Sequence, residues 1–184
     1  MRLFIATTFP GEVLRDLNAR VAAARPRLPA GSWVRQETQH LTFAFLGEQP
    51  ESLLDRISAP LTEALAKVPK FEASIRDCGF FPNPRRARVG WAGLNPEEKF
   101  GAVARAVREV VTQNGVALDG GEFKAHLTLV RIRDPWPPAS IDLFQRTLRD
   151  FRSEPFAMSS VTLYASQLDP NGAIHTPQRE FALG

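Results

Sequence analysis

The tripeptide His-Leu-Thr occurs twice in this chain, at residues 40–42 and again 86 positions later at residues 126–128. Each copy opens a run whose side chains alternate between apolar and polar, as in a half-buried β-strand. In the first run, His40-Leu41-Thr42-Phe43-Ala44-Phe45, the period of two places leucine and both phenylalanines on one face. Histidine and threonine share the other face. We therefore expect two equivalent strands, each presenting a histidine and a threonine on the same side.

The shift of 86 positions also relates the residues upstream of each tripeptide. A strand and an amphipathic helix precede the first copy, and a strand and a helix with the same apolar spacing precede the second. The shift carries Leu3, Ile5 and Ala6 onto Val89, Trp91 and Ala92, and Leu14, Leu17, Val21 and Ala24 onto Phe100, Val103, Val107 and Val110. This register predicts a single domain built by internal duplication, with halves at about 1–86 and 87–184.

The remaining pattern continues to alternate strands with helices and contains no long linker. An Asn171-Gly172 pair near the end predicts a hairpin turn. The expected strands lie near residues 2–8, 40–45, 71–75, 88–94, 123–130, 156–165 and 174–183, and the expected helices near 14–24, 54–68, 97–110 and 140–148. Duplicated halves commonly pack about an approximate two-fold axis. Such packing would place the two His-Leu-Thr strands across a cleft from each other.

Composition favours a soluble globular protein. The 184 residues are 43% hydrophobic and 23% charged, which excludes a disordered or fibrous chain. No segment is long and apolar enough to span a membrane. The single cysteine, Cys78, cannot form an intrachain disulfide, and this suits a reducing compartment. We expect a cytoplasmic monomer. Its net charge of +3, carried mostly by arginine, gives weak support for phosphate-containing partners.

Two opposed imidazoles have a clear chemical use. One can take a proton from a nucleophile while the other protonates a leaving oxygen, since both titrate near neutral pH. The hydroxyls of Thr42 and Thr128 can donate hydrogen bonds to phosphate oxygens held between His40 and His126. The pattern therefore predicts in-line displacement at phosphorus without a metal or another cofactor. A zinc site is disfavoured, because each repeat offers a single imidazole and threonine is a poor zinc ligand. The third histidine, His175, falls outside both repeats and is expected to be an exposed strand residue.

The paired motifs resemble those of a known superfamily. His40-Leu41-Thr42-Phe43 and His126-Leu127-Thr128-Leu129 match the two HxTx motifs of the 2H phosphoesterases. The stretches 1–6, 33–35, 45–48 and 127–131 look like the RNA 2′,3′-cyclic phosphodiesterases of that superfamily, also called 2′-5′ RNA ligases. Residues 163–168 with Gly172 are similar to that family's closing hairpin. The resemblance covers nearly the whole chain.

This resemblance implies an α+β fold of two pseudo-symmetric lobes, each an antiparallel β-sheet with helices on its outer face, flanking a central cleft. It implies hydrolysis of RNA or nucleotide 2′,3′-cyclic phosphates to 2′-phosphomonoesters. His40 would be the proton donor to the leaving 3′ oxygen and His126 the proton acceptor that activates water. Thr42 and Thr128 would hold the phosphate. Arg131 also matches a family position for substrate binding.

Strict alternation, however, puts Arg131 on the face opposite His126, with Leu127 and Leu129. It reaches the cleft only if the strand bends or bulges. Arg35 ranks lower still as a substrate-binding candidate.

Aromatic residues offer a second kind of substrate contact. Trp33, Phe80 and Phe81 are candidates for stacking on a nucleobase, although aromatics beside glycine and proline are more often packing or turn residues.

Two alternatives to the hydrolase remain open at this point. The same site could join RNA ends by the reverse reaction, as a 2′-5′ RNA ligase, or the chain could be a non-catalytic RNA-binding module. RNA with a cyclic phosphate end and cyclic nucleotides are the expected ligands in the enzymatic interpretations.

Overall fold

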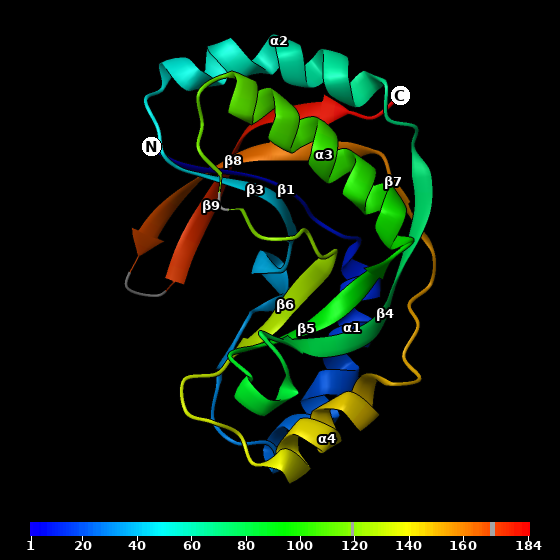
Figure 1. The fold of residues 1–184 in the computed structure, drawn as a ribbon. Helices are drawn as coiled ribbons and strands as arrows, with labels where there is room; N and C mark the ends of the chain where they lie inside the picture. Colours follow the sequence, from blue (N-terminus) through cyan, green and yellow to red (C-terminus); the bar gives the residue numbers. More distant parts are fainter. Residues whose placement is uncertain (119, 170–171) are drawn as a thin grey trace.

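Two antiparallel sheets stand one above the other in the computed structural model, which describes residues 1–118, 120–169 and 172–184 (Figure 1). The upper sheet has the strand order β3-β1-β8-β9 and the lower sheet β2-β6-β5-β4-β7. The strands are β1 (Arg2–Thr7), β2 (Ser32–Trp33), β3 (Leu41–Glu48), β4 (Phe71–Phe81), β5 (Val89–Asn95), β6 (His126–Arg131), β7 (Phe156–Met158), β8 (Ser160–Asp169) and β9 (Gly172–Ala182). The predicted class, α+β with two antiparallel lobes, is confirmed.

Four α-helices are present in the described chain, and they cover the outer faces of the two sheets. Helices α2 (Ser52–Ala66) and α3 (Glu97–Gln113) lie over the upper sheet, and α1 (Gly11–Ala24) and α4 (Pro138–Leu148) lie beneath the lower one (Figure 1). None of the helices in these described ranges is long and apolar enough to cross a bilayer. Residues of β3 and β6 border the space between the two lobes.

The two strand–helix–strand segments recur with the spacing that the sequence predicts. In each segment a proline, Pro10 or Pro96, stands directly before the helix, where its missing N–H costs no hydrogen bond. Both sheets nevertheless take strands from both ends of the chain, since β4 joins the lower sheet while β8 and β9 complete the upper one. A lobe is therefore not the same as a half of the sequence.

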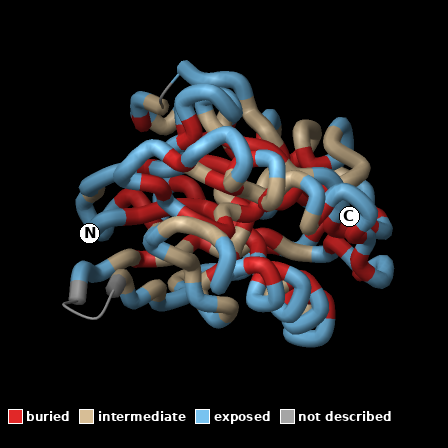
Figure 2. Tube along the Cα trace, turned by 90° about the horizontal axis from the view of Figure 1, so that it is seen from below, coloured by how far each residue is buried: buried red, intermediate tan, exposed pale blue. Residues whose placement is uncertain are grey.

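One continuous apolar core runs through both lobes, as the buried segments in Figure 2 show. Each helix contributes the face that its periodicity predicts. Phe100 and Val103 of α3 and Leu17 of α1 are fully buried. Phe43 and Leu41 of β3 are buried as well. This packing fixes β3 firmly, so that the side chains on its other face are held in position.

The closing hairpin is formed by β8 and β9, which pair antiparallel along their length. Of the predicted Asn171-Gly172 turn, Asn171 lies outside the described residues. Short strand β2 and three 3₁₀ turns have no clear periodic signal in the sequence.

Candidate active site

The two histidines are held by the same backbone contact. The Nδ1 atom of His40 lies 2.7 Å from the carbonyl oxygen of Thr38, and Nδ1 of His126 lies 2.8 Å from that of Lys124. A carbonyl oxygen only accepts hydrogen bonds, so the Nδ1 atoms carry the protons and donate. Each Nε2 is then left for proton transfer. The two copies of the motif therefore share the histidine and also its hydrogen bond to the backbone carbonyl two residues earlier.

A β-bulge follows each histidine at the same relative position. Between β1 and β3, Ile5 pairs with Ala44 and Ala6 pairs with Thr42, which leaves Phe43 as the extra residue. Between β5 and β6, the pairing passes from Val130 to Thr128 in the same way and leaves out Leu129. Phe43 and Leu129 are again 86 positions apart. Each bulge shifts the alternation by one residue from that point onward.

The bulges overturn two expectations that rested on strict alternation. Phe45, expected on the buried face with Phe43, is 65% exposed and lines the cleft. Arg131, expected opposite His126, also lines the cleft. These two residues occupy equivalent positions in the two strands. A charged residue at an apparently apolar position of β6 was the one sequence signal of the bulge.

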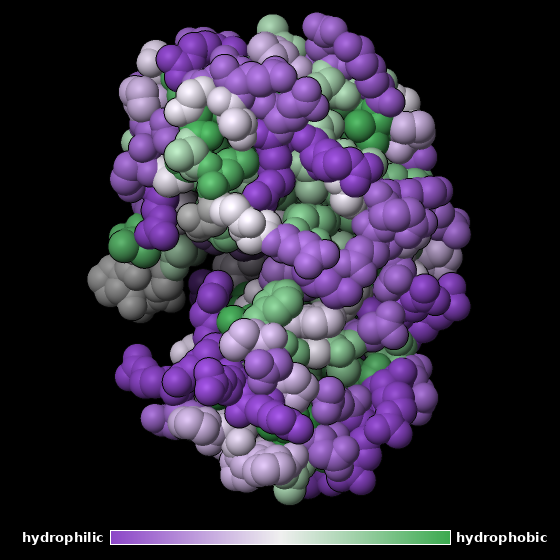
Figure 3. Space-filling model, in the orientation of Figure 1, coloured by the Kyte–Doolittle hydropathy of each residue, from purple (hydrophilic) through white to green (hydrophobic). Residues whose placement is uncertain are grey.

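A cleft of about 270 Å³ between the lobes contains all four residues of the predicted catalytic set. Figure 3 shows the molecule hollowed between its upper and lower halves, with hydrophilic side chains along the lower rim. The lining residues are Val34, Thr38, Gln39, His40, Thr42, Phe45, Phe81, Val89, His126, Thr128 and Arg131. The fold therefore brings together the histidines and threonines of the two His-Leu-Thr motifs and Arg131.

Only one of the three aromatic stacking candidates reaches this cleft. The ring of Phe81 lies edge-on to His126, with centroids 4.8 Å apart. Phe80 is buried against Phe144, and Trp33 packs on Trp136. Arg35, the weaker arginine candidate, borders a separate hollow beside Trp33. Trp33, Phe80 and Arg35 are thus set away from the cleft.

Burial lowers the pKa of both histidines. For His40 the hydrogen bond to Thr38 opposes this effect, and the nearby His175, Arg131 and His126 lower the pKa further. For His126 the hydrogen bond to Lys124 opposes it, and the charges of Arg131 and Lys124 lower it. Both imidazoles therefore lose their protons more readily than an exposed histidine does.

His175 is not the exposed residue that the sequence predicts. Strand β9 brings its ring within 5.3 Å of the His40 ring, nearly perpendicular to it, and both rings contact Phe4. Its Nδ1 atom is buried and has no hydrogen-bond partner among the described residues. His175 is absent from the cleft lining. It touches His40 without bordering the space between the two catalytic candidates.

Two antiparallel lobes that hold paired histidines and threonines across a cleft define the 2H class of phosphoesterase folds. The chain belongs to the 2′-5′ RNA ligase superfamily, whose family model matches residues 13–170.

Its relatives include the RNA 2′,3′-cyclic phosphodiesterase of Thermus thermophilus, 34% identical over 100% of this chain and 90% of that protein. The enzyme of the same name from Methanothermobacter thermautotrophicus is 30% identical over 100% and 99%.

Solved structures agree with this assignment. A crystal structure of a Thermus thermophilus protein superposes with a TM-score of 0.78 at 29% identity, covering 100% of this chain and 98% of that one. Escherichia coli LigT complexed with 3′-AMP gives a TM-score of 0.76 at 26% identity, covering 99% and 97%.

Proposed function

We propose that this protein is an RNA 2′,3′-cyclic phosphodiesterase that opens cyclic phosphate ends, on RNA and on nucleotides, to 2′-phosphomonoesters. The observation that carries the proposal is the convergence of His40, His126, Thr42, Thr128 and Arg131 on one cleft. The names of the relatives support the substrate class.

The reaction requires one proton to arrive and one to leave. His126, in its neutral form, takes the proton of a water molecule as the water oxygen attacks phosphorus. The bond from phosphorus to the 3′ oxygen breaks on the opposite side, and protonated His40 donates to that oxygen. Because each Nδ1 is bound to a carbonyl, both transfers use Nε2. The step needs no metal, since histidines supply both proton transfers.

The threonines and Arg131 act on the phosphate itself. Negative charge grows on its non-bridging oxygens as the fifth ligand approaches. The hydroxyls of Thr42 and Thr128 donate hydrogen bonds to these oxygens, and the Arg131 guanidinium offers them two parallel N–H donors. The same cation lowers the pKa of both histidines. A bound phosphate offsets that effect and restores protonation of the proton donor.

A direct assay tests the proposal. An oligonucleotide ending in a 2′,3′-cyclic phosphate and 2′,3′-cyclic mononucleotides are incubated with the protein in EDTA, and 2′- and 3′-phosphate products are resolved. We expect turnover to the 2′-phosphate. If freshly prepared protein turns over neither substrate, the hydrolase proposal is wrong. The alternative of a non-catalytic RNA-binding module is then favoured.

Phe45 offers its exposed ring to the nucleobase. We expect Phe45→Ala to raise KM for adenosine 2′,3′-cyclic phosphate roughly tenfold, as expected for the loss of one stacking contact. Phe45→Tyr should restore binding. The matched substrate is ribose 2′,3′-cyclic phosphate without a base, on which both variants should equal the native protein. An equal loss on the abasic substrate would show that Phe45 acts on something other than the base.

The pH dependence follows from the lowered pKa values. A lower pKa keeps His126 neutral to more acidic pH and removes the proton from His40 as pH rises toward neutrality. The profile of kcat/KM should therefore be a bell with its maximum on the acidic side of the ordinary imidazole pKa of about 6.5. His175→Phe removes a neighbouring imidazole that lowers the pKa of His40. That variant should move the alkaline limb to higher pH. A single limb in the native protein, or an unmoved profile in the variant, would contradict these expectations.

A further inference from the structure

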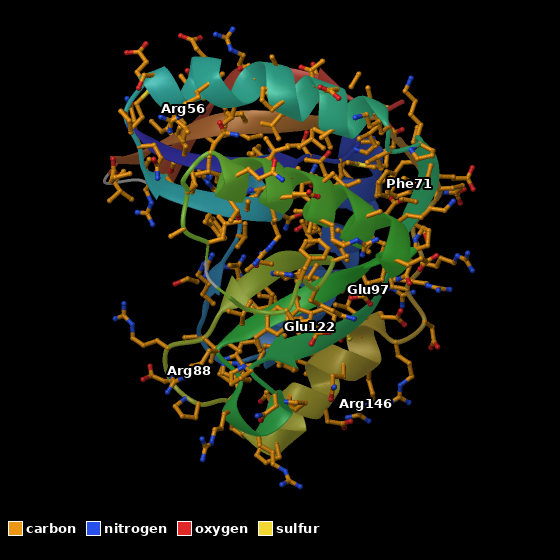
Figure 4. The ribbon with its side chains drawn as sticks, turned by 45° about the horizontal axis from the view of Figure 1, so that its top comes forward. Arg56, Phe71, Arg88, Glu97, Glu122 and Arg146 are labelled. Carbon is orange, nitrogen blue, oxygen red and sulfur yellow. The ribbon has the colours of Figure 1, made fainter. Side chains whose placement is uncertain are left out.

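A second hollow lies against the lower sheet, apart from the catalytic cleft. Its volume, about 270 Å³, equals that of the cleft, and the two spaces share no lining residue. In Figure 4 the labels of Phe71 and Glu97 mark its side of the molecule, since these residues adjoin Glu72 and Pro96 of its lining. Its polar lining residues are Glu72, Ser74, Arg76, Asn95, Arg152 and Ser153. We call this hollow the arginine pocket.

Strand alternation gathers most of these side chains on one face. The period of two puts Glu72, Ser74 and Arg76 on the same face of β4. Ser74 pairs with Asn95 of β5, and Arg76 forms an isolated bridge with Arg152. Side chains of directly opposed residues project on the same side of a sheet. Three separate segments of the chain therefore supply one polar surface.

The segment that carries Arg152 is fastened to β4 through Ser153. The Ser153 N–H donates to the carbonyl of Ile75 at 2.9 Å, and the Ile75 N–H donates to the Ser153 hydroxyl at 2.8 Å. Ser153 is buried. Its hydroxyl is thus committed to the backbone of β4, and Arg152 is held opposite Arg76.

Two like charges stand directly opposite each other in this pocket, an arrangement that destabilises a sheet. The Arg76 guanidinium donates to Oδ1 of Asn95 at 3.1 Å and lies 3.8 Å from a carboxylate oxygen of Asp77. The side chain of Arg152 makes no hydrogen bond or ion pair with any residue in the described ranges. An anion bound between the two guanidinium groups would offset their repulsion.

Ser74 supplies a neutral donor beside the arginines. The residue is 9% exposed, and its hydroxyl has no hydrogen-bond partner among the residues that the structure describes. A nearly buried hydroxyl without a partner is costly. Because Ser74 lines the pocket, an oxygen atom bound there would accept its hydrogen bond.

We propose that the arginine pocket binds the phosphate group of a small sugar phosphate, at a site separate from the catalytic cleft. Guanidinium groups bind phosphate through parallel N–H donors, and the Ser74 hydroxyl adds a further contact. Glu72 lines the same pocket and carries the opposite charge. Its carboxylate accepts hydrogen bonds from sugar hydroxyls and repels additional phosphates. The lining therefore favours a single phosphomonoester that carries hydroxyl groups over a strand of nucleic acid.

Calorimetric titration with ribose 5-phosphate tests the proposal. The catalytic cleft also offers Arg131 to a phosphate, so the titrations use an Arg131→Glu background. We expect this protein to bind one equivalent of ribose 5-phosphate and not to bind ribose. Adding Arg152→Glu should weaken the binding of ribose 5-phosphate about tenfold or more, since a charge-assisted hydrogen bond is lost and a repulsive charge is gained. Inorganic phosphate should bind more weakly, because it has no sugar hydroxyls to donate to Glu72.

The pocket offers a matched control and a second variant. Arg105 is exposed on α3 and lines neither space, so that Arg105→Glu should leave the binding unchanged. Arg152→Glu with the native Arg131 should keep the native melting temperature and hydrolyse adenosine 2′,3′-cyclic phosphate at the native rate. Glu72→Ala should tighten the binding of inorganic phosphate and remove the advantage of the sugar phosphate.

The titrations distinguish the possible occupants. If ribose 5-phosphate does not bind to the Arg131→Glu protein, or binds equally well after Arg152→Glu, the arginine pocket is not a phosphate site. An RNA oligonucleotide that ends in a 3′-hydroxyl is the second probe. If the strand binds more tightly than ribose 5-phosphate and its binding depends on Arg152, the sugar-phosphate class is wrong. Weaker binding of the strand, or binding that Arg152→Glu leaves unchanged, supports that class.

Discussion

Replacing His126 with alanine is expected to slow the opening of a 2′,3′-cyclic phosphate by roughly 10² to 10⁴-fold, the usual cost of losing a general base. His40→Ala should cost a similar factor through loss of the acid. Both side chains are partly buried but lie at the cleft. The loss should therefore fall on kcat, with the fold unchanged by circular dichroism and thermal melting.

A modified substrate can distinguish the histidine that acts as proton donor from the one that acts as proton acceptor. In a cyclic phosphate with sulfur at the 3′ position, the leaving group needs little protonation. Such a substrate should rescue His40→Ala and leave His126→Ala inactive. The reverse pattern would exchange the two roles. His175→Ala is the control, since His175 touches His40 but does not line the cleft. Damage equal to that of His40→Ala would contradict the assignment of the pair.

Removing one threonine hydroxyl should slow the reaction by about 10² to 10³-fold, the effect of losing a donor to developing negative charge. Thr42→Val and Thr128→Val keep the shape of the side chain and its preference for strands. Because the hydroxyl acts on charge that grows in the transition state, kcat should fall more than KM rises. Steady-state kinetics on a cyclic mononucleotide measures both quantities.

Serine provides the complementary variant. Thr42→Ser and Thr128→Ser keep the donor and should retain most of the activity. Thr62→Val on the exposed face of α2 controls for a general effect of the substitution. Equal activity of the valine and serine variants would mean that the hydroxyls do not act on the phosphate.

The parts of the site that follow local rules were predictable from sequence. The His-Leu-Thr pair and its shift of 86 positions predicted opposed strands, and the apolar spacing predicted α1 and α3. The mixing of strands between sheets was not predictable, because the pairing of β8 with β1 joins residues far apart in the chain. Nothing in the local pattern around His175 indicates that it will rest against His40.

The bulges show where a periodic rule fails. A period of two assigns faces correctly up to Phe43 and Leu129 and wrongly beyond them, because one extra residue in each strand inverts the alternation. Comparing the two copies would have revealed this. Phe45 and Arg131 occupy equivalent positions, and a buried arginine without a partner is costly enough to argue against the face assigned to it.

The bulge position also gives the cleft a polarity. Two copies of one motif supply chemically equivalent proton carriers, and a symmetric cleft would accept a nucleic acid strand in either orientation. An aromatic ring stands at the bulge-shifted position of one copy and a guanidinium at that of the other. A strand threaded backwards would meet the cation where it carries a base and the ring where it carries charge. Exchanging the two residues should therefore weaken discrimination between strand directions while the pair of imidazoles stays in place.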